Sequence, residues 1–100
     1  MIKNIFNVTS IPSGGELFET ILKNSRVHIE RITSSDSVES NEYVQAHDEW
    51  VMLLDGQAEL KIGNRIMALK KGDHLYIKSG TQHTVVKTAK GTIWLAVHIH

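Results

Sequence analysis

The chain has 100 residues, of which 41% are apolar, and its eleven basic side chains balance eleven acidic ones. This length fits one domain and excludes both a (β/α)8 barrel and a two-domain dinucleotide enzyme. Because the net charge is zero, no sequence-wide field attracts nucleic acid, and no apolar run approaches the length of a membrane span. We therefore expect a soluble, cytoplasmic protein with no nucleic acid and no membrane among its partners.

Residues 1–25 differ from the rest of the chain and predict a segment that packs on the main domain. Ser13 and Glu16 have the spacing of a capping box, in which two side chains satisfy free amides at the start of a helix. Apolar residues then recur at helical spacing from Leu17 to Leu22. This pattern predicts a short N-terminal helix over residues 15–23, with its apolar face closing one end of the domain.

Residues 26–100 alternate between apolar and polar side chains, which is typical of β-strands. Tight turns separate the alternating segments, and Asp55-Gly56 and Gly63-Asn64 are strong hairpin turns. Because no connection is long enough for a βαβ crossover, the sequence predicts an all-β antiparallel sandwich or barrel. The seven predicted strands are 26–33, 49–54, 57–62, 65–69, 74–78, 82–88 and 92–99.

The sequence contains no cysteine and six histidines. The absence of thiols excludes disulfides and thiolate-ligated zinc or iron–sulfur centres. Any metal would therefore be held by histidine, carboxylate, amide or phenol groups. Each histidine taken singly is most simply a solvated or hydrogen-bonded strand residue. The six are His28, His47, His74, His83, His98 and His100.

Two motifs lie within the predicted barrel. The first runs from Glu49 to Gly56, with six residues between the glutamate and the glycine. The second begins at Gly72 and continues through Gly80 to His83. In their spacing these motifs resemble those of the cupins, which are small double-stranded β-helix, or jelly-roll, barrels. The resemblance covers roughly residues 26–100 and implies one cupin barrel.

The resemblance also implies a place for a metal. Glu49 and His83 stand at two of the four metal-binding positions of the family, and Tyr43 and Gln45 stand where the family has a pair of histidines. Tyr43, Gln45, His47 and Glu49 share parity, so on one continuous strand they would face the same side. We expect Glu49, His83, Gln45 and His47 to bind one divalent metal, with Zn, Fe, Mn or Ni suited to these donors.

Three functions are compatible with this pattern. The first is a metal-dependent cupin enzyme that acts on a small polar or carboxylate-bearing molecule by oxygenation, isomerisation or decarboxylation. The second is a metal-free barrel in which Tyr43, Gln45, Glu49 and His83 bind a sugar or small acid, with His83 as a general acid or base. The third is a non-catalytic sensor or accessory module that acts as a dimer.

The last predicted strand presents two different faces. Trp94, Ala96, His98 and His100 lie on one face, and aliphatic residues lie on the other. We expect the aliphatic row to form the core between the sheets. This arrangement turns His98 outward or into an interface.

A second apolar row predicts a partner. If Glu49 faces the barrel interior, then Trp50, Met52 and Leu54 face away from it, and an exposed row of this size is unfavourable for a monomer. We expect a homodimer in which two sheets pack back to back. The alternative is that the N-terminal segment covers the row with its own apolar residues, which are Ile5, Phe6, Leu17 and Phe18.

Overall fold

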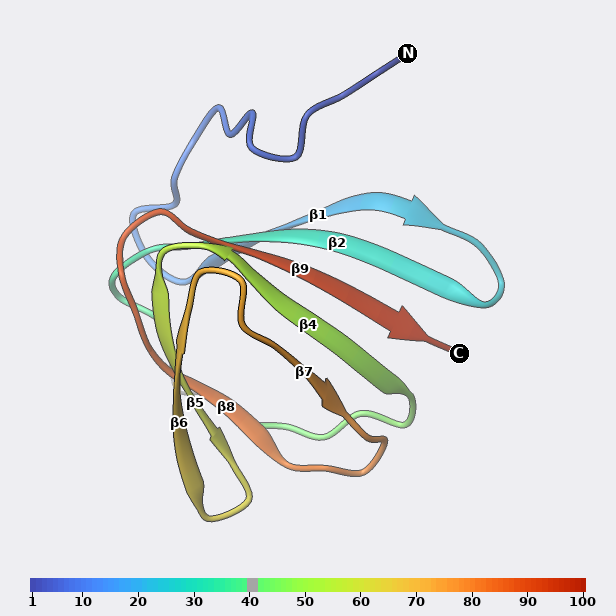
Figure 1. Cartoon of the computed structure of the whole chain (residues 1–100), viewed down its shortest axis with the longest axis vertical. Helices are drawn as coiled ribbons and strands as arrows, with labels where there is room; N and C mark the ends of the chain where they lie inside the picture. Colours follow the sequence, from blue (N-terminus) through green and yellow to red (C-terminus); the bar gives the residue numbers. More distant parts are fainter. Residues whose placement is uncertain (40–41) are drawn as a thin grey trace.

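In the computed structural model, which describes residues 1–39 and 42–100, two β-sheets face each other (Figure 1). No helix long and apolar enough to cross a membrane occurs in this part of the chain. The strands are β1 (Glu16–Lys23), β2 (Val27–Ser34), β3 (Glu42–Tyr43), β4 (Asp48–Asp55), β5 (Gln57–Ile62), β6 (Arg65–Lys70), β7 (His74–Ile77), β8 (His83–Thr88) and β9 (Thr92–Ile99).

The topology is that of a double-stranded β-helix. One sheet has the order β1-β2-β9-β4-β7, the other has the order β3-β8-β5-β6, and the pairing is antiparallel throughout. From β4 onward the chain changes sheet at every connection except the β5–β6 hairpin (Figure 1). The predicted all-β barrel is confirmed, and each of the seven predicted strands matches an observed strand to within one residue at either end.

The predicted helix over residues 15–23 is wrong, because this segment is the edge strand β1. It pairs with β2 along most of its length, from Glu16 opposite Ser34 to Lys23 opposite His28. Glu16 does not cap a helix; its Oε2 accepts a hydrogen bond of 2.6 Å from the Ser34 hydroxyl. A long partner strand supplies backbone hydrogen bonds along most of the segment, and this outweighs a weak helical pattern that begins with two glycines.

The segment before β4 is not one continuous strand. β3 ends at Tyr43 and β4 begins at Asp48, so shared parity does not place the intervening side chains on one face. The backbone N–H of Gly80 donates to the carbonyl of Gln45 at 2.8 Å. This bond fixes the segment against the turn of the second motif.

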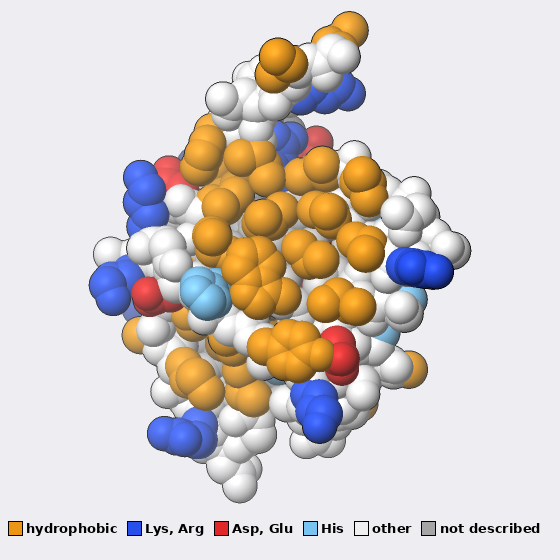
Figure 2. Space-filling view, turned by 45° about the vertical axis from the view of Figure 1, so that its right-hand side comes forward, with side chains coloured by type: hydrophobic (Ala, Val, Ile, Leu, Met, Phe, Trp, Pro, Cys, Tyr) orange, Lys and Arg blue, Asp and Glu red, His pale blue; other side chains and the backbone are white. Residues whose placement is uncertain are grey.

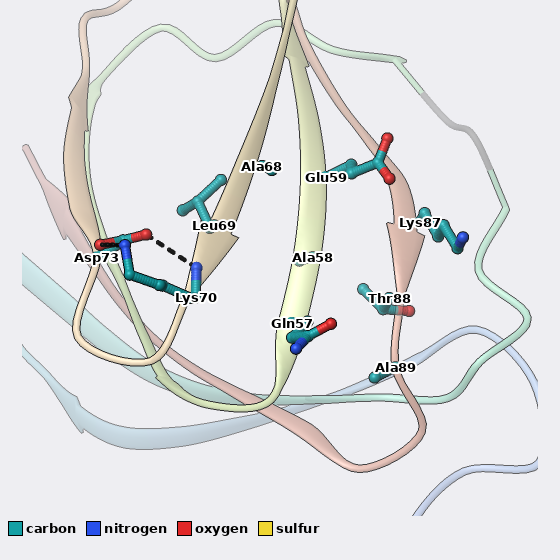
Figure 3. A pocket seen from close by; sticks show the side chains of 10 residues that line it. All are labelled: Gln57, Ala58, Glu59, Ala68, Leu69, Lys70, Asp73, Lys87, Thr88 and Ala89. Atoms are coloured by element: carbon teal, nitrogen blue, oxygen red, sulfur yellow. Dashed lines mark hydrogen bonds and ion pairs between the residues drawn. The ribbon is translucent and has the colours of Figure 1, made fainter.

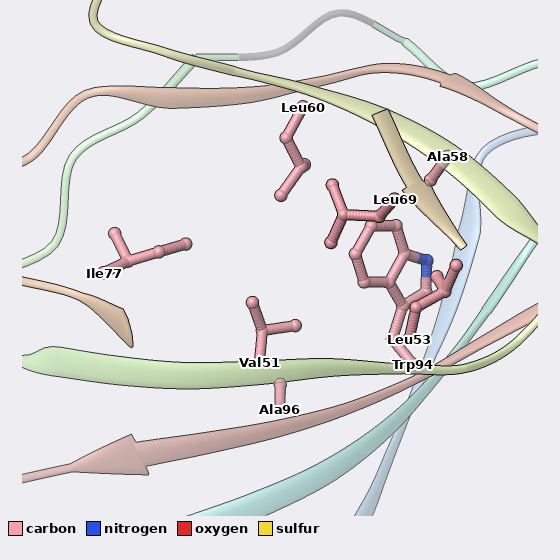
Figure 4. Packing of buried hydrophobic residues seen from close by; sticks show 8 residues of the cluster. All are labelled: Val51, Leu53, Ala58, Leu60, Leu69, Ile77, Trp94 and Ala96. Carbon is pink, nitrogen blue, oxygen red and sulfur yellow. The ribbon is translucent and has the colours of Figure 1, made fainter. Parts of the chain in front are cut away.

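The core lies between the two sheets and is formed by inward-facing residues of five strands, with two residues each from β4, β5 and β9 (Figure 4). Trp94 is the largest of them, and its indole N–H donates to the Ser34 hydroxyl at 3.0 Å, so the polar atom of the buried ring is satisfied. The buried cluster consists of Val51, Leu53, Ala58, Leu60, Leu69, Ile77, Trp94 and Ala96.

The expected orientation of β9 is reversed in the structure. Trp94, Ala96 and His98 face the interior and are buried, whereas Leu95 and Val97 lie on the outer side and are half-buried. The cause is the pairing of β9 with the inward-facing residues of β4, since paired residues of adjacent strands project to the same side of a sheet. His98 is therefore an interior residue.

The turn between β4 and β5 yields a test of the packing. Gly56 has φ of +98°, and a Cβ there would lie 2.3 Å from the Thr92 hydroxyl and 2.8 Å from the Thr92 Cα. We expect Gly56→Ala to lower the free energy of unfolding by about 3 kcal/mol, because the clash involves backbone. Gly63→Ala is the matched control, since Gly63 has φ of +58° but open space around it. We expect Gly63→Ala to lower the free energy of unfolding, measured in urea, by about 1 kcal/mol. Equal losses for the two variants would show that the contact with Thr92 does not destabilise Gly56→Ala.

Candidate ligand and metal site between the sheets

A cavity of about 110 Å³ lies between the sheets at the end of the barrel where β4 and β8 begin and β9 ends. Its walls are mostly aliphatic and aromatic, with polar side chains at a few points. Four of the predicted site residues line this cavity, and they come from three strands and the segment before β4. They are Tyr43, Gln45, Glu49 and His83.

Glu49 and His83 face each other across the cavity from opposite sheets. Both are buried, at 7% and 8% exposure, and Glu49 Oε1 lies 3.8 Å from His83 Nε2. This separation is too long for a hydrogen bond, and each atom is therefore open to a third group placed between them.

His83 is held in a defined tautomer. Its Nδ1 lies 3.1 Å from the carbonyl oxygen of Thr81, which only accepts hydrogen bonds. The proton of the neutral ring therefore sits on Nδ1, and Nε2 presents a lone pair toward Glu49. An imidazole whose other nitrogen is fixed by a carbonyl is the usual form of a metal-binding or proton-accepting histidine.

Two buried oxygens at the cavity lack hydrogen-bond partners. They are Gln45 Oε1 and Glu49 Oε1, and both belong to residues that line the cavity. Burial raises the pKa of the Glu49 carboxyl above its ordinary value, although the nearby His98 and His83 oppose the shift. A buried acceptor without a partner costs about 1–3 kcal/mol, so a bound group that satisfies both oxygens stabilises this region.

His47 is not brought to the cavity. Its Nε2 lies 2.9 Å from His98 Nδ1, and its ring packs beside that of His100, with the ring centroids 4.4 Å apart. The pKa of His47 is lowered by burial and by the neighbouring imidazoles of His98 and His100. Of the four expected metal ligands, the structure therefore gathers Glu49, His83 and Gln45.

Three polar residues of the cavity were not predicted, namely Glu16, Glu30 and His98. His98 Nε2 lies 2.7 Å from Glu30 Oε1, and this pair forms part of the wall beside Glu49. The signal that could have found His98 is the pairing of β9 with β4, because Glu49 lies directly opposite His98 in register. No comparable sequence signal identifies Glu30, because it occupies an ordinary polar position in a strand that alternates between apolar and polar residues.

The lining of the cavity is acidic. It carries the carboxyls of Glu16, Glu30 and Glu49 and two imidazoles, and no lysine or arginine is among the lining residues. Burial also raises the pKa of Glu16, against the opposing effect of its hydrogen bond from Ser34. Such a lining favours a cation or an uncharged hydrogen-bonding molecule and disfavours an anion without a counter-ion.

The three donor atoms fit a divalent metal by their chemistry. Glu49 Oε1, His83 Nε2 and Gln45 Oε1 form a nitrogen and oxygen set in which both oxygens lack a partner. Within residues 1–39 and 42–100, no three histidine or acidic side chains converge as a metal cluster. A metal at this point would therefore depend on the amide of Gln45 as its third protein ligand.

A larger cavity of about 420 Å³ lies on the other sheet, along β5, β6 and β8 (Figure 3). One of its two acidic residues, Asp73, already accepts from the Lys70 backbone N–H at 2.8 Å and pairs with the Lys70 ammonium at 3.7 Å. None of its lining residues carries a buried unpartnered side-chain atom like those of Gln45 and Glu49. We therefore place the candidate site between the sheets.

Comparison with known proteins agrees with this architecture. A putative mannose-6-phosphate isomerase from Ralstonia eutropha JMP134 is 30% identical, with a TM-score of 0.88 over 99% of this chain and 97% of that one. An uncharacterised protein with a double-stranded β-helix domain from Klebsiella pneumoniae is 20% identical, with a TM-score of 0.84 over 98% of this chain and 88% of that one. No curated protein matches the sequence. The model of the cupin domain family (Cupin_2) matches residues 31–98, and the chain is therefore a cupin.

Proposed function

We propose that the cavity between the sheets binds a small, uncharged polar molecule together with one divalent metal. The supporting observation is the arrangement of Glu49 Oε1, His83 Nε2 and Gln45 Oε1, in which both oxygens are buried without partners and the nitrogen presents a lone pair. Tyr43 and His98 complete the polar wall. The acidic lining supports a cation at this point more than a free anionic ligand.

The reaction class that suits these groups is isomerisation by proton transfer. With Oε1 on the metal, the second carboxylate oxygen of Glu49 would take a proton from the ligand and return it. His83 Nε2 has a single lone pair and would hold the metal, while the Thr81 carbonyl fixes the ring orientation. A bound metal would act as a Lewis acid on a ligand oxygen. The name of the Ralstonia protein supports this class.

The substrate proposed here differs from a sugar phosphate. No lysine or arginine lines the cavity, whereas three glutamates do, and the volume of about 110 Å³ is small. A phosphate monoester usually requires arginine, lysine or a helix N-terminus to balance its charge. A short hydroxylated aldehyde or ketone fits the lining better.

The metal is tested by elemental analysis of untagged protein. We expect the divalent metal content of the wild type to fall by about one ion per chain in His83→Ala, because one of the three donors between the sheets is removed. His74→Ala is the control, since that ring lies beside Trp50 on the outer face of the sheet. Substoichiometric metal in the wild type that His83→Ala leaves unchanged would overturn the metal part of the proposal.

The metal-free cavity is the second candidate, and the unpartnered Gln45 oxygen also supports it, since a ligand hydroxyl could donate to it. In that case chelator-treated protein should melt at a higher temperature with a short polyol or hydroxycarbonyl compound, and Gln45→Ala should abolish the shift. A panel of such compounds that leaves the melting temperature of metal-free and metal-loaded protein unchanged would reject ligand binding at this site.

The proton on Glu49 is tested through stability. A carboxyl whose pKa is raised by folding binds its proton more tightly in the native state, so the free energy of unfolding falls as pH rises from the unfolded pKa to the folded one. We expect Glu49→Gln and the wild type to be close in stability near pH 4 and the variant to gain on the wild type toward neutral pH. Urea unfolding of chelator-treated protein measures this difference, and parallel pH profiles would contradict it.

We further propose that a second copy of the chain covers the outer face of the five-stranded sheet. Hydrophobic side chains form a broad continuous surface there (Figure 2). Trp50 and Val97 are paired in register, as are Met52 and Leu95, and all four are half-buried. Tyr76, paired with Trp50, is 54% exposed.

The N-terminal segment supplies only part of a cover for this face. The Arg31 guanidinium donates to the carbonyls of Ile5 and Asn7 at 2.9 and 3.2 Å, which places the segment over β2. Phe6 remains 52% exposed. The β4 side of the face is therefore the part that a two-fold partner would bury.

The dimer is tested by light scattering. We expect twice the chain mass for the wild type and the chain mass for Met52→Lys, because a buried ammonium in an apolar interface lacks a partner. Ile66→Lys is the matched control, since Ile66 lies on the other sheet and is 60% exposed. A wild-type mass of one chain would reject the dimer.

A further inference from the structure

Four histidines gather at the open end of the barrel, beside the candidate site. The ring centroid of His47 lies 4.9 Å from that of His98 and 4.4 Å from that of His100, and the His98 centroid lies 5.6 Å from that of His28. They come from three segments, which are β2, the residues just before β4, and the end of β9 together with the residue that follows it. None of the ring nitrogens of these four histidines is among the metal donors proposed between the sheets.

The hydrogen bonds fix which nitrogens are available. The carboxylate of Glu30 only accepts, so the proton of the neutral His98 ring lies on Nε2, 2.7 Å from Glu30 Oε1. His98 Nδ1 then carries a lone pair, and it lies 2.9 Å from His47 Nε2. The ring of His98 is thus oriented by a carboxylate behind it, while its free nitrogen points at a second imidazole.

This arrangement is that of a metal ligand and its supporting carboxylate. Two nitrogens bound at a right angle to one metal, each at 2.0–2.1 Å, lie about 2.9 Å apart. The hydrogen bond between His98 Nδ1 and His47 Nε2 has this length, so the two nitrogens need rotate but not move apart to share one metal. Right-angled imidazole donors suit the square-planar and octahedral geometries of Cu²⁺ and Ni²⁺.

We propose that His47 Nε2 and His98 Nδ1, with His100 as a third donor, bind a late first-row transition-metal dication at the rim of the barrel. Binding replaces the proton shared by the two nitrogens and releases it to solvent. In residues 1–39 and 42–100 no three such side chains are already placed to hold a metal, so the proposal requires the His100 ring to reorient toward the other two. Its side chain is exposed, while its backbone N–H is anchored to the Arg26 carbonyl at 2.7 Å.

The rim site does not depend on the proposed function. Its ligands differ from Glu49, His83 and Gln45. The His98 nitrogen that it uses, Nδ1, is hydrogen-bonded to His47 and points away from the cavity. A chain with no metal between the sheets would therefore still bind one at the rim, and the reverse also holds.

Isothermal titration with NiCl₂ tests the site in the untagged full chain that carries Glu49→Gln and His83→Ala, so that only the rim can respond. We expect one Ni²⁺ per chain in this background. Adding His47→Ala or His100→Ala should weaken binding at least tenfold, and Glu30→Gln should weaken it about tenfold while leaving all three rings in place. Adding His74→Ala, which removes a histidine on the outer sheet face, should change nothing.

Each outcome bears on the proposal. Loss of binding with His47→Ala and His100→Ala, together with retention in His74→Ala, supports the rim site. Absence of Ni²⁺ binding in the background, unchanged affinity in His47→Ala, or equal loss in His74→Ala overturns it. His98 is buried, so its substitution is not used, and near-UV circular dichroism checks that every variant compared is folded. If the chain with Glu49→Gln and His83→Ala does not fold, the rim substitutions are made in the wild type instead. The Ni²⁺ bound at the rim is then the part that His83→Ala alone does not remove.

Discussion

The pairing of β4 with β9 is the constraint on which the rest of the structure depends. Its register places Leu53 opposite Trp94, Val51 opposite Ala96 and Glu49 opposite His98. Because paired residues project to the same side, the core and the polar end of the barrel are successive rungs of one ladder. A shift of this register by one residue would expose the core and remove Glu49 and His98 from the interior together.

Most of the fold could be predicted from the sequence, because alternation and glycine-containing turns are local signals. β1 could not, since its state is decided by the long partner β2 rather than by its own residues. The orientation of β9 was also inaccessible, because both of its faces are apolar enough to be core and only the pairing with β4 decides between them. The spacing of the two motifs was enough to locate Glu49 and His83. His98 could be assigned to the cavity only from the tertiary structure, because its direction depends on the pairing of β9 with β4.

The candidate site places several ionisable groups where water is scarce. Glu49 and His83 are each less than a tenth exposed, and Glu16 and Glu30 lie in the same wall. Ionising several carboxyls in such a space is unfavourable unless a cation or a proton balances them. Burial raises the pKa values of Glu16 and Glu49, which expresses this cost. The metal and the retained proton are thus two physical solutions to the same electrostatic problem.

The hydrogen bond from the Gly80 N–H to the Gln45 carbonyl links a turn to the chemistry of the cavity. Gly80 has φ of +79° and begins the short path that leads to His83, while Gln45 contributes one of the unpartnered oxygens. Insertions or deletions between β7 and β8 would therefore move two polar groups of the cavity, on Gln45 and His83, together. Variation in the length of this one turn offers a route by which relatives of this barrel could acquire different ligands without altering the β-sheets.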